Sequence, residues 1–522
     1  MTINQSGWRP EAPLANGAGE QPTFTGNRAL MLEEPLLFEI GSTDRTGVDF
    51  EPAPAAPNRL AGLERGAINL PGLSEPETVR HYTRLSRQNY AIDLGVFPLG
   101  SCTMKHNPRL NERIARLPGF ADIHPLQPVS TVQGALAVIQ ELAIWLIRLT
   151  GMYGVAMAPK AGAHGELCGI LCIRAALDAR GETNRRVLLV PESAHGTNPA
   201  TAAFAGYSVE NIPATAEGRV DLAALQARLG PDIAGVMITN PNTCGLFERD
   251  MKAISDAVHA AGGYVYCDGA NFNAIVGRVR PGDLGIDAMH INLHKTFSTP
   301  HGGGGPGSGP VVFSAALAPF APLPFVEKRG DGFALVEEET AGEHHGSSFG
   351  RMAAFHGQMG MFTRALAYIL SHGADGLRQV AEDAVLNANY VLRSLDDLLD
   401  APFGASGPCM HEALFSDAGL AAGFTTLDIA KGLIDEGFHP MTMYFPLVVH
   451  GAMLIEPTET EGKATLDQFI GALRSVAERA QAGDAALKAA PAFAPRRRLD
   501  ETAAARKPVL VWKDAELPEA AE

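Results

Sequence analysis

Residues 263–297 of the chain read GYVYCDGANFNAIVGRVRPGDLGIDAMHINLHKTF, and two features of this stretch decide the fold class. The apolar run YVYC has the length of a strand and ends at Asp268, and the run DAMHINL at 287–293 is a second strand-length segment that leads to Lys295. Continuous apolar runs are typical of strands that are buried on both faces, as in a parallel sheet covered by helices. Charged residues at the ends of two such strands predict a ligand site at the carboxyl edge of the sheet.

The same alternation of strand-length and helix-length segments continues upstream of this stretch. The expected strands are 186–191, 207–213 and 233–239, and the expected helices are 132–150, about 164–180, about 221–229 and about 250–261. Strands separated by helices predict an α/β fold with a mostly parallel sheet in a large domain.

Changes in composition along the chain predict four segments. They are an N-terminal arm at 1–94 with a docking segment at 29–41, a large α/β domain at 95–370, a smaller C-terminal α+β domain at 371–490 and a tail at 491–522. The smaller domain is expected to begin with a long helical segment, followed by strands at 410–415 and 441–445 and a helix at about 466–480.

Overall composition excludes several classes of protein. Hydrophobic residues make up 46% and charged residues 19% of the 522 residues, which is typical of a globular enzyme. The formal net charge of −16 argues against nucleic-acid binding. The most apolar stretch, at 135–149, is too short and too charged for a membrane span, and the N-terminus lacks an apolar signal segment, so a cytoplasmic location is expected. The six cysteines lack paired spacing, which predicts neither a disulfide framework nor a metal site.

Two further motifs precede the opening stretch and supply groups that suit a phosphorylated aromatic ligand. AGAHGE at 161–166 opens a helix, and the free backbone N–H groups of Ala161, Gly162 and Ala163 are expected to hold a phosphate. SAHGTNPA at 193–200 contributes His195, whose ring can stack on a pyridine ring. Taken separately, each motif has an alternative interpretation. AGAHGE could be only a tight entry to a helix, and His195 could be a packed or surface histidine.

Asp268 and Lys295 complete this candidate site. A carboxylate at the end of a buried strand needs a partner, and a protonated pyridine nitrogen is one that would let the ring accept electrons. Burial of Lys295 would lower its pKa toward the range in which the neutral amine forms a Schiff base. Taken alone, Asp268 could cap the turn before Gly269 and Lys295 could reach solvent, but the ordered set favours a pyridoxal 5′-phosphate (PLP) site.

Two loops leave alternatives open. TNPN at 239–242 offers Asn240, or its competitor Asn242, to a phenolic oxygen of the ligand, although this string is also common in turns. HGGGGPGSGP at 301–310 could approach an anion through its backbone or act as a hinge. The position of this loop argues against a dinucleotide-binding role. In dinucleotide-binding folds the glycine-rich loop opens the first βα unit, whereas this loop follows a late strand.

Five strings of the chain resemble the glycine decarboxylase P-protein family of fold-type-I PLP enzymes. They are PLGSCTMKHNP (98–108), MAPKAGAHGE (157–166), PESAHGTNPATA (191–202), CDGANFNAIVG (267–277) and NLHKTFSTPHGGGGPG (292–307). The similarity runs from about residue 33 to residue 512. The chain resembles the catalytic C-terminal half of the family's one-chain form, which many bacteria make as a separate second subunit.

The resemblance implies roles for particular residues. Lys295 would form the Schiff base, Asp268 would face the ring nitrogen, His195 would stack on the ring, and Ala161, Gly162 and Ala163 would hold the phosphate. Further contacts are expected from Thr197, Asn198, Asn240, His294, Ser101, Cys102 and Thr103.

The resemblance also implies a reaction and partners. Glycine would lose its carboxylate as CO2, and the aminomethyl group would pass to the lipoyl arm of H-protein, which supplies the thiol chemistry. No metal is expected. A partner subunit 1 would complete an α2β2 assembly. The alternatives are another fold-type-I activity, such as an amino-acid decarboxylase or a cysteine desulfurase, and a non-catalytic binding subunit, against which the presence of Lys295 argues.

Overall fold

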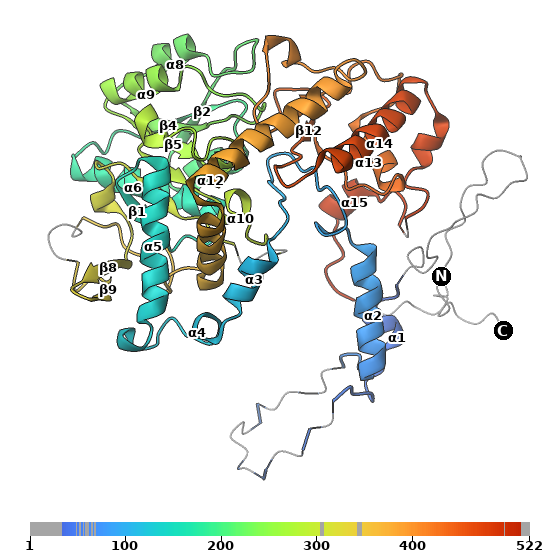
Figure 1. Cartoon of the computed structure of the whole chain (residues 1–522), viewed down its shortest axis with the longest axis horizontal. Helices are drawn as coiled ribbons and strands as arrows, with labels where there is room; N and C mark the ends of the chain where they lie inside the picture. Colours follow the sequence, from blue (N-terminus) through green and yellow to red (C-terminus); the bar gives the residue numbers. More distant parts are fainter. Residues whose placement is uncertain are drawn as a thin grey trace, which may run out of the picture. The chain divides into compact units, whose positions relative to one another are not determined.

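The computed structural model describes residues 34–512 except 49, 52–53, 56, 58–61, 64–65, 67–68, 303–306, 342–346 and 495 (Figure 1). These residues form two compact units. The smaller unit takes its described residues from Met1–Ala91, Lys431–Gly437 and Asp484–Glu522, and the larger unit comprises Ile92–Ala430 and Phe438–Gly483. Parts of three predicted features lie outside the described residues: the docking segment before residue 34, the glycine loop at 303–306 and the tail beyond residue 512.

A seven-stranded sheet is the centre of the larger unit. Its strand order is β1-β7-β6-β5-β4-β2-β3. The strands are β1 (Gly154–Ala156), β2 (Val187–Pro191), β3 (Ser208–Ile212), β4 (Ile233–Thr239), β5 (Tyr264–Asp268), β6 (Ala288–His290) and β7 (Val311–Phe313). Strands β2 to β6 pair in parallel, whereas β7 runs antiparallel to both β1 and β6. The predicted α/β class and mostly parallel sheet are confirmed.

Helices cover both faces of this sheet because successive strand residues point to opposite sides. Along β4, Val236 packs in the core cluster that contains residues of α5, α8, α9 and α12, and Met237 packs in the cluster with α6 and α7. These helices are α5 (Gln133–Thr150), α6 (Gly162–Ala179), α7 (Thr197–Phe204), α8 (Leu222–Arg228), α9 (Met251–Ala260) and α12 (Met359–Leu395). The carboxyl ends of β4, β5 and β6 therefore open between two helical layers.

A second, three-stranded sheet of the larger unit has the order β10-β12-β11 and is antiparallel. Its strands are β10 (Ala413–Phe415), β11 (Thr442–Met443) and β12 (Met453–Ile455), and α14 (Lys463–Gln481) follows them. The predicted boundary at residue 371 falls inside α12, two residues before Gly373, whose φ of 64° and ψ of −174° interrupt the helix. The four predicted segments stay a prediction.

The remaining elements are short, apart from one helix within the predicted arm. That helix, α2 (Glu75–Gln88), begins at a capping box in which Ser74 and Glu77 bond to each other's backbone. The others are α1 (Leu37–Ile40), α3 (Arg109–Ala115), α4 (Pro118–Ala121), α10 (Leu293–Thr296), α13 (Thr426–Asp435), α15 (Glu501–Arg506) and the hairpin strands β8 (Phe325–Arg329) and β9 (Gly332–Val336). Within the described ranges, no helix combines the length and the apolar character that crossing a bilayer requires.

The prediction of a single strand over 287–293 is wrong. Strand β6 ends at His290, and after Asn292 the chain enters the short helix α10, which carries Lys295. The apolar run continues through both elements because both are buried, so the run alone does not show where the chain leaves the sheet.

Candidate active site

A pocket of about 190 Å³ lies at the carboxyl ends of β4, β5 and β6, where the N-terminus of α6 meets them. The residues that line it are Ser101, Gly162, Ala163, Glu166, His195, Thr197, Thr239, Thr243, Asp268, Ala270, Asn271, His290, Asn292, His294 and Lys295. Eight of the predicted contact residues are in this set: Ser101, Gly162, Ala163, His195, Thr197, Asp268, His294 and Lys295. Ala161 is the residue that precedes α6, and Asn240 lies beside the pocket without lining it.

Asp268 is the last residue of β5 and is only 4% exposed. Its Oδ2 accepts a hydrogen bond from Nδ2 of Asn198 (3.0 Å), and its Oδ1 accepts one from the backbone N–H of Ala270 (2.9 Å). Burial would raise the pKa of this carboxyl, but the nearby imidazole of His290 and these two donors outweigh burial and hold the pKa below its usual value. Asp268 is therefore an anion at neutral pH and can partner a cation in the pocket.

Lys295 reaches the pocket from α10. Its Nζ donates to the backbone carbonyl oxygen of Ser101 at 2.8 Å, so the amine is held by a neutral acceptor. Ser101 belongs to a segment far away in the sequence, which the fold brings to the pocket. An amine held in this way can be released to a ligand without breaking an ion pair.

The N-terminus of α6 faces the same pocket. The helix begins at Gly162 after an extended Ala161, so its first backbone N–H groups have no intrahelical acceptor and suit an anion. The approach of the helix is close: a Cβ on Gly162 would lie 2.8 Å from Nδ2 of Asn292, and one on Gly165 would lie 2.7 Å from Cβ of His290. Only glycine lets this helix end approach the sheet edge so closely.

His195 lies at the exposed side of the pocket, after β2. Its Nδ1 is 2.8 Å from Oγ1 of Thr197, and its ring meets Phe445 edge-on at a centroid separation of 5.6 Å. Partial burial lowers the pKa of this imidazole, although the negative charge of Asp268 opposes the effect. Contacts with Thr197 and Phe445 thus orient a predominantly neutral ring over the pocket.

A chain of hydrogen bonds runs along the floor of the pocket from Tyr266 to His294. The hydroxyl of Tyr266 lies 2.6 Å from Nδ1 of His290, Nε2 of His290 lies 3.0 Å from Oδ1 of Asn292, and Nδ2 of Asn292 lies 3.3 Å from Nε2 of His294. Because the amide of Asn292 donates only through nitrogen, all three bonds fit one direction, from the tyrosine to His294. Nδ1 of His294 then carries the proton.

Glu166 adds a second carboxyl to the pocket. Its two oxygens accept hydrogen bonds from Oγ1 of Thr197 (2.7 Å) and Oγ1 of Thr201 (3.1 Å). Burial, and next the charge of Asp268, raise the pKa of Glu166 to about 7. Glu166 therefore exchanges a proton near neutral pH, whereas Asp268 does not.

The two asparagines of the TNPN turn have different surroundings. Asn242 uses both side-chain atoms within the protein: Nδ2 donates to Glu248 (2.7 Å) and Oδ1 accepts from the backbone of Cys244 (3.0 Å). Asn240 accepts one bond from the backbone of Glu248, and its buried Nδ2 has no partner among the described residues. Of the two, Asn240 has a donor left for a ligand.

Sequence reasoning gave no role to Glu166, His290 or Asn292. Glu166 lies inside the AGAHGE string, so its position was visible but its role was not. His290, Asn292 and His294 occupy alternate positions of the apolar run at 287–293 and just after it. Polar residues with this spacing share one face of an extended segment, which was a usable signal.

Comparisons with known proteins agree with this geometry. The family model "Glycine dehydrogenase, C-terminal domain" matches residues 380–491, and "Aminotransferase class-V" matches residues 169–305. A probable glycine dehydrogenase (decarboxylating) subunit 2 from Caulobacter vibrioides is 66% identical over 98% of each chain. A protein of the same description from Listeria innocua is 48% identical over 92% of this chain and 99% of its own length.

Solved structures share the fold at lower identity. The inhibitor-bound glycine decarboxylase (P-protein) of the glycine cleavage system has a TM-score of 0.68 at 21% identity, over 82% of this chain and all of that one. A NifS-like protein from Rickettsia africae has a TM-score of 0.54 at 14% identity, over 74% of this chain and 99% of that one. Both relationships support the fold assignment.

Proposed function

The chain belongs to the family of glycine dehydrogenase (decarboxylating) subunit 2, and from this premise we propose that it decarboxylates glycine and passes the aminomethyl group to the lipoyl arm of H-protein. The enzyme class follows from relatives that align over almost the entire chain. At 66% and 48% identity these relatives favour glycine decarboxylation over another fold-type-I activity.

PLP is the cofactor of this family, and the pocket fits it. Asp268 offers an anion for the protonated ring nitrogen, Lys295 offers an amine for the aldehyde carbon, and His195 offers a flat ring for the cofactor's face. The first N–H groups of α6, at Ala161, Gly162 and Ala163, would hold the phosphate. Thr197 and His294, which line the pocket, and Asn240 beside it would add polar contacts, and the buried Nδ2 of Asn240 has no acceptor among the described residues.

The chain's own residues would carry out the proton chemistry. When bound, PLP supplies an electron sink for the carbanion that the loss of CO2 leaves. Asp268 remains an anion and so keeps a proton on the ring nitrogen, which maintains the sink. Lys295, once released from Ser101, is an amine within the same pocket and can accept and return protons there.

One observation carries this proposal: the fold brings the amine of Lys295 and the carboxylate of Asp268 to the same pocket, beside a free helix N-terminus. A non-catalytic binding subunit has no need for this arrangement. We further propose that the chain works in the cytoplasm with subunit 1, in an α2β2 assembly.

The test is the absorption spectrum of the purified chain with PLP, before and after borohydride treatment. A band near ~420 nm that borohydride removes, and that Lys295→Ala lacks, is the expected result. Glycine-dependent CO2 release that requires both H-protein and subunit 1 would establish the family role. CO2 release without H-protein would overturn the proposed transfer, and the absence of the band from the unsubstituted chain would overturn the cofactor site.

A further inference from the structure

Residues 101–105, with the sequence SCTMK, reach the pocket at Ser101 and are held by three buried glutamates. The backbone N–H of Ser101 donates to Glu412, Oγ1 of Thr103 donates to Glu456 at 2.5 Å, and Nζ of Lys105 pairs with Glu459 at 2.8 Å. The three held residues, Ser101, Thr103 and Lys105, are spaced two apart along the segment. We refer to residues 101–105 as the wall segment.

The glutamates come from the antiparallel sheet of the larger unit and the turn after it. Glu412 directly precedes β10 and Glu456 directly follows β12, and these two strands pair, with Ala413 opposite Ile455. The residue before the wall segment also joins this sheet, where Gly100 N–H donates to the carbonyl of Leu454 in β12 at 3.2 Å. The end of the sheet at which Glu412 and Glu456 lie therefore fixes the position of the wall segment.

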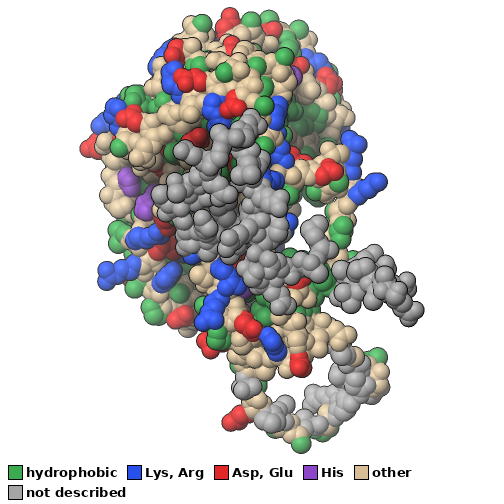
Figure 2. All heavy atoms as spheres, turned by 90° about the vertical axis from the view of Figure 1, so that its right-hand side faces the viewer, with side chains coloured by type: hydrophobic (Ala, Val, Ile, Leu, Met, Phe, Trp, Pro, Cys, Tyr) green, Lys and Arg blue, Asp and Glu red, His purple; other side chains and the backbone are tan. Residues whose placement is uncertain are grey.

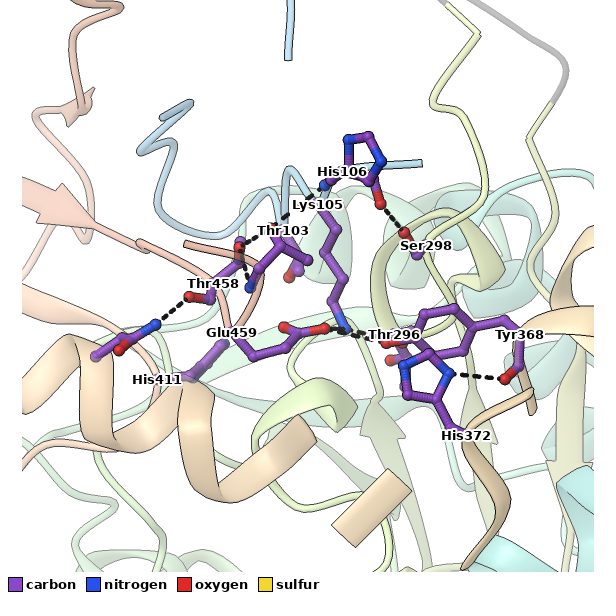
Figure 3. Close-up of polar contacts among 12 residues, drawn as sticks. Thr103, Lys105, His106, Thr296, Ser298, Tyr368, His372, His411, Thr458 and Glu459 are labelled. Atoms are coloured by element: carbon purple, nitrogen blue, oxygen red, sulfur yellow. Dashed lines mark hydrogen bonds and ion pairs between the residues drawn. The ribbon is translucent and has the colours of Figure 1, made fainter. Parts of the chain in front are cut away.

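The wall segment and α10 hold each other through two lysines. Lys295 of α10 donates to the carbonyl of Ser101 (2.8 Å), and Lys105 of the wall segment donates to the carbonyl of Thr296 (2.9 Å), the residue after Lys295. Figure 3 shows the Lys105 side chain extending between Glu459 and Thr296. Each segment thus sends one ammonium group to a backbone oxygen of the other.

These two bonds differ in what happens to them when a ligand binds. Lys295 must leave the carbonyl of Ser101 to reach an aldehyde in the pocket, so its bond is lost during the proposed function. Neither Lys105 nor Thr296 lines the pocket, so ligand binding does not require the bond between them to break. Because α10 has only four residues, it has little internal rigidity of its own, and this bond restrains it.

We propose that Lys105, oriented by Glu459, is a positioning residue that restrains the end of α10 and thereby sets where the amine of Lys295 meets the cofactor's aldehyde. This inference rests on the proposed function. It assigns Lys105 no contact with substrate or cofactor, and it concerns the rate at which Lys295 captures an aldehyde.

The burial of the pair supports a positional role. The side chains of Lys105 and Glu459 are 1% and 8% exposed, and a buried ion pair is a poor source of stability because desolvation offsets most of the attraction. The backbone of Ser101 also has a φ of 63°, an unusual value for serine that persists only where neighbours determine it. Both features indicate that the precise path of the wall segment matters.

The experiment uses the full-length protein without cofactor and measures two reactions. Rapid mixing with PLP gives the rate at which the ~420 nm band forms, which requires Lys295. Titration with pyridoxamine 5′-phosphate, which has an amine in place of the aldehyde, gives the affinity of the pocket for the same ring and phosphate without using Lys295.

Three variants are compared with the unsubstituted protein. Lys105→Met removes the ammonium group, and the double variant Lys105→Met/Glu459→Met removes both charges, so that no buried carboxylate is left unpaired. The control is Lys463→Met, which removes an exposed ammonium group paired with Asp467 in α14. Thermal unfolding checks that each variant is folded.

We expect the rate of band formation to fall about 10- to 100-fold in both Lys105 variants, with the affinity for pyridoxamine 5′-phosphate within twofold and the control unchanged. Band formation at the unsubstituted rate in the folded double variant would overturn the inference. An equal loss of pyridoxamine 5′-phosphate affinity would also overturn it, since the pair would then support the pocket in general. A protein that binds pyridoxamine 5′-phosphate but forms no band even when unsubstituted would instead contradict the proposed function.

Discussion

At the scale of single residues, the site contains two kinds of carboxyl group: those that stay charged at neutral pH and those that take up a proton. Asp268 is kept anionic by His290 and by two hydrogen-bond donors, whereas burial raises the pKa of Glu166 and of Glu412 to about 7. Burial, and next the charge of Glu412, also raise the pKa of Glu456 well above its usual value. The low-dielectric interior thus tolerates several carboxyls because most of them are not charged together.

Replacing Asp268 with asparagine tests its assigned role. The amide keeps the shape of the carboxyl but cannot hold a proton on the ring nitrogen, so the cofactor loses its electron sink while Lys295 remains. We expect the ~420 nm band to form and glycine-dependent CO2 release to fall by about 100-fold, the effect of losing one charged hydrogen bond worth ~3 kcal/mol. Unchanged CO2 release in Asp268→Asn would show that another group protonates the ring.

The buried Glu412 gives the cofactor-free protein a specific pH dependence. Burial raises its pKa from the ordinary 4.5 to about 7, so the folded state binds the proton more tightly than the unfolded state. The stability from this group is complete below about pH 4.5 and is lost as the pH rises through about 7, by roughly 3 kcal/mol in total. Glu412→Gln stays neutral and still accepts from the backbone of Ser101, so its unfolding free energy should decline less between pH 5 and pH 8. If the unfolding free energies of the two proteins, measured in urea, declined in parallel across this pH range, the raised pKa of Glu412 would be contradicted.

At the scale of elements, the approach of α6 to the sheet depends on Gly165. An added Cβ would lie 2.7 Å from Cβ of His290 and 2.8 Å from the carbonyl oxygen of Gly309, and both are fixed neighbours. Gly165→Ala should therefore destabilise the protein by about 1–3 kcal/mol and weaken pyridoxamine 5′-phosphate binding, because the helix N-terminus must move away from the pocket. The measurements are urea unfolding and ligand titration.

The matched control for this substitution is Gly471, an exposed glycine inside α14. A Cβ there meets nothing within 4 Å. Alanine is the better helix former, so Gly471→Ala should stabilise the protein by about 0.5–1 kcal/mol and leave ligand binding unchanged. Equal effects of the two substitutions would mean that the contacts of Gly165 are unimportant.

Elements with long apolar runs could be predicted from the sequence with close bounds, whereas short ones were predicted with bounds that were too wide or were missed. The strand at 233–239 was predicted with the bounds that β4 has, and the helix predicted at about 164–180 begins two residues earlier, at Gly162. Strand β7 has three residues between a Gly- and Pro-rich loop and a turn, so it carries no periodic signal. It is also the strand that makes the sheet mixed, because it runs antiparallel to its neighbours. It lies between β6 and β1, and β1 is far from it in the sequence.

The site was predictable where its residues follow one another along the sheet edge. Lys295, Asp268 and His195 each follow a buried strand, so their convergence follows from parallel topology. Glu412 and Glu456, by contrast, meet partners that are 311 and 353 residues away in the sequence. No local pattern encodes which distant carboxyl will hold which donor, and one sequence alone gives no pairing information.

At the scale of the whole molecule, charged side chains of both signs occur on the same face. Lys and Arg side chains are interspersed with Asp and Glu on the face that Figure 2 shows. With a formal net charge of −16, the chain repels other acidic surfaces at long range, and specific association depends on local complementarity.

The composition of the assembly that the chain forms with subunit 1 is a further prediction. Mixing the two purified subunits should give a single species with two copies of each, because the proposed assembly is α2β2. Light scattering coupled to size-exclusion chromatography measures its mass, and CO2 release from glycine should appear only in the mixed fractions. A one-to-one dimer with full activity would contradict the stoichiometry while leaving the catalytic assignment intact.

The order of the sheet also determines when the site can form during synthesis. Strand β1 leaves the ribosome early, yet the strand beside it is β7, and the wall segment at 101–105 waits for Glu456 and Glu459. A nascent chain therefore carries an unpaired edge at β1 until β7 at 311–313 has emerged, the condition in which chains aggregate or engage chaperones. The residues that line the pocket lie between 101 and 295, but the support that Glu456 and Glu459 give to the wall segment arrives much later, so a chain truncated before residue 456 has the pocket residues without that support.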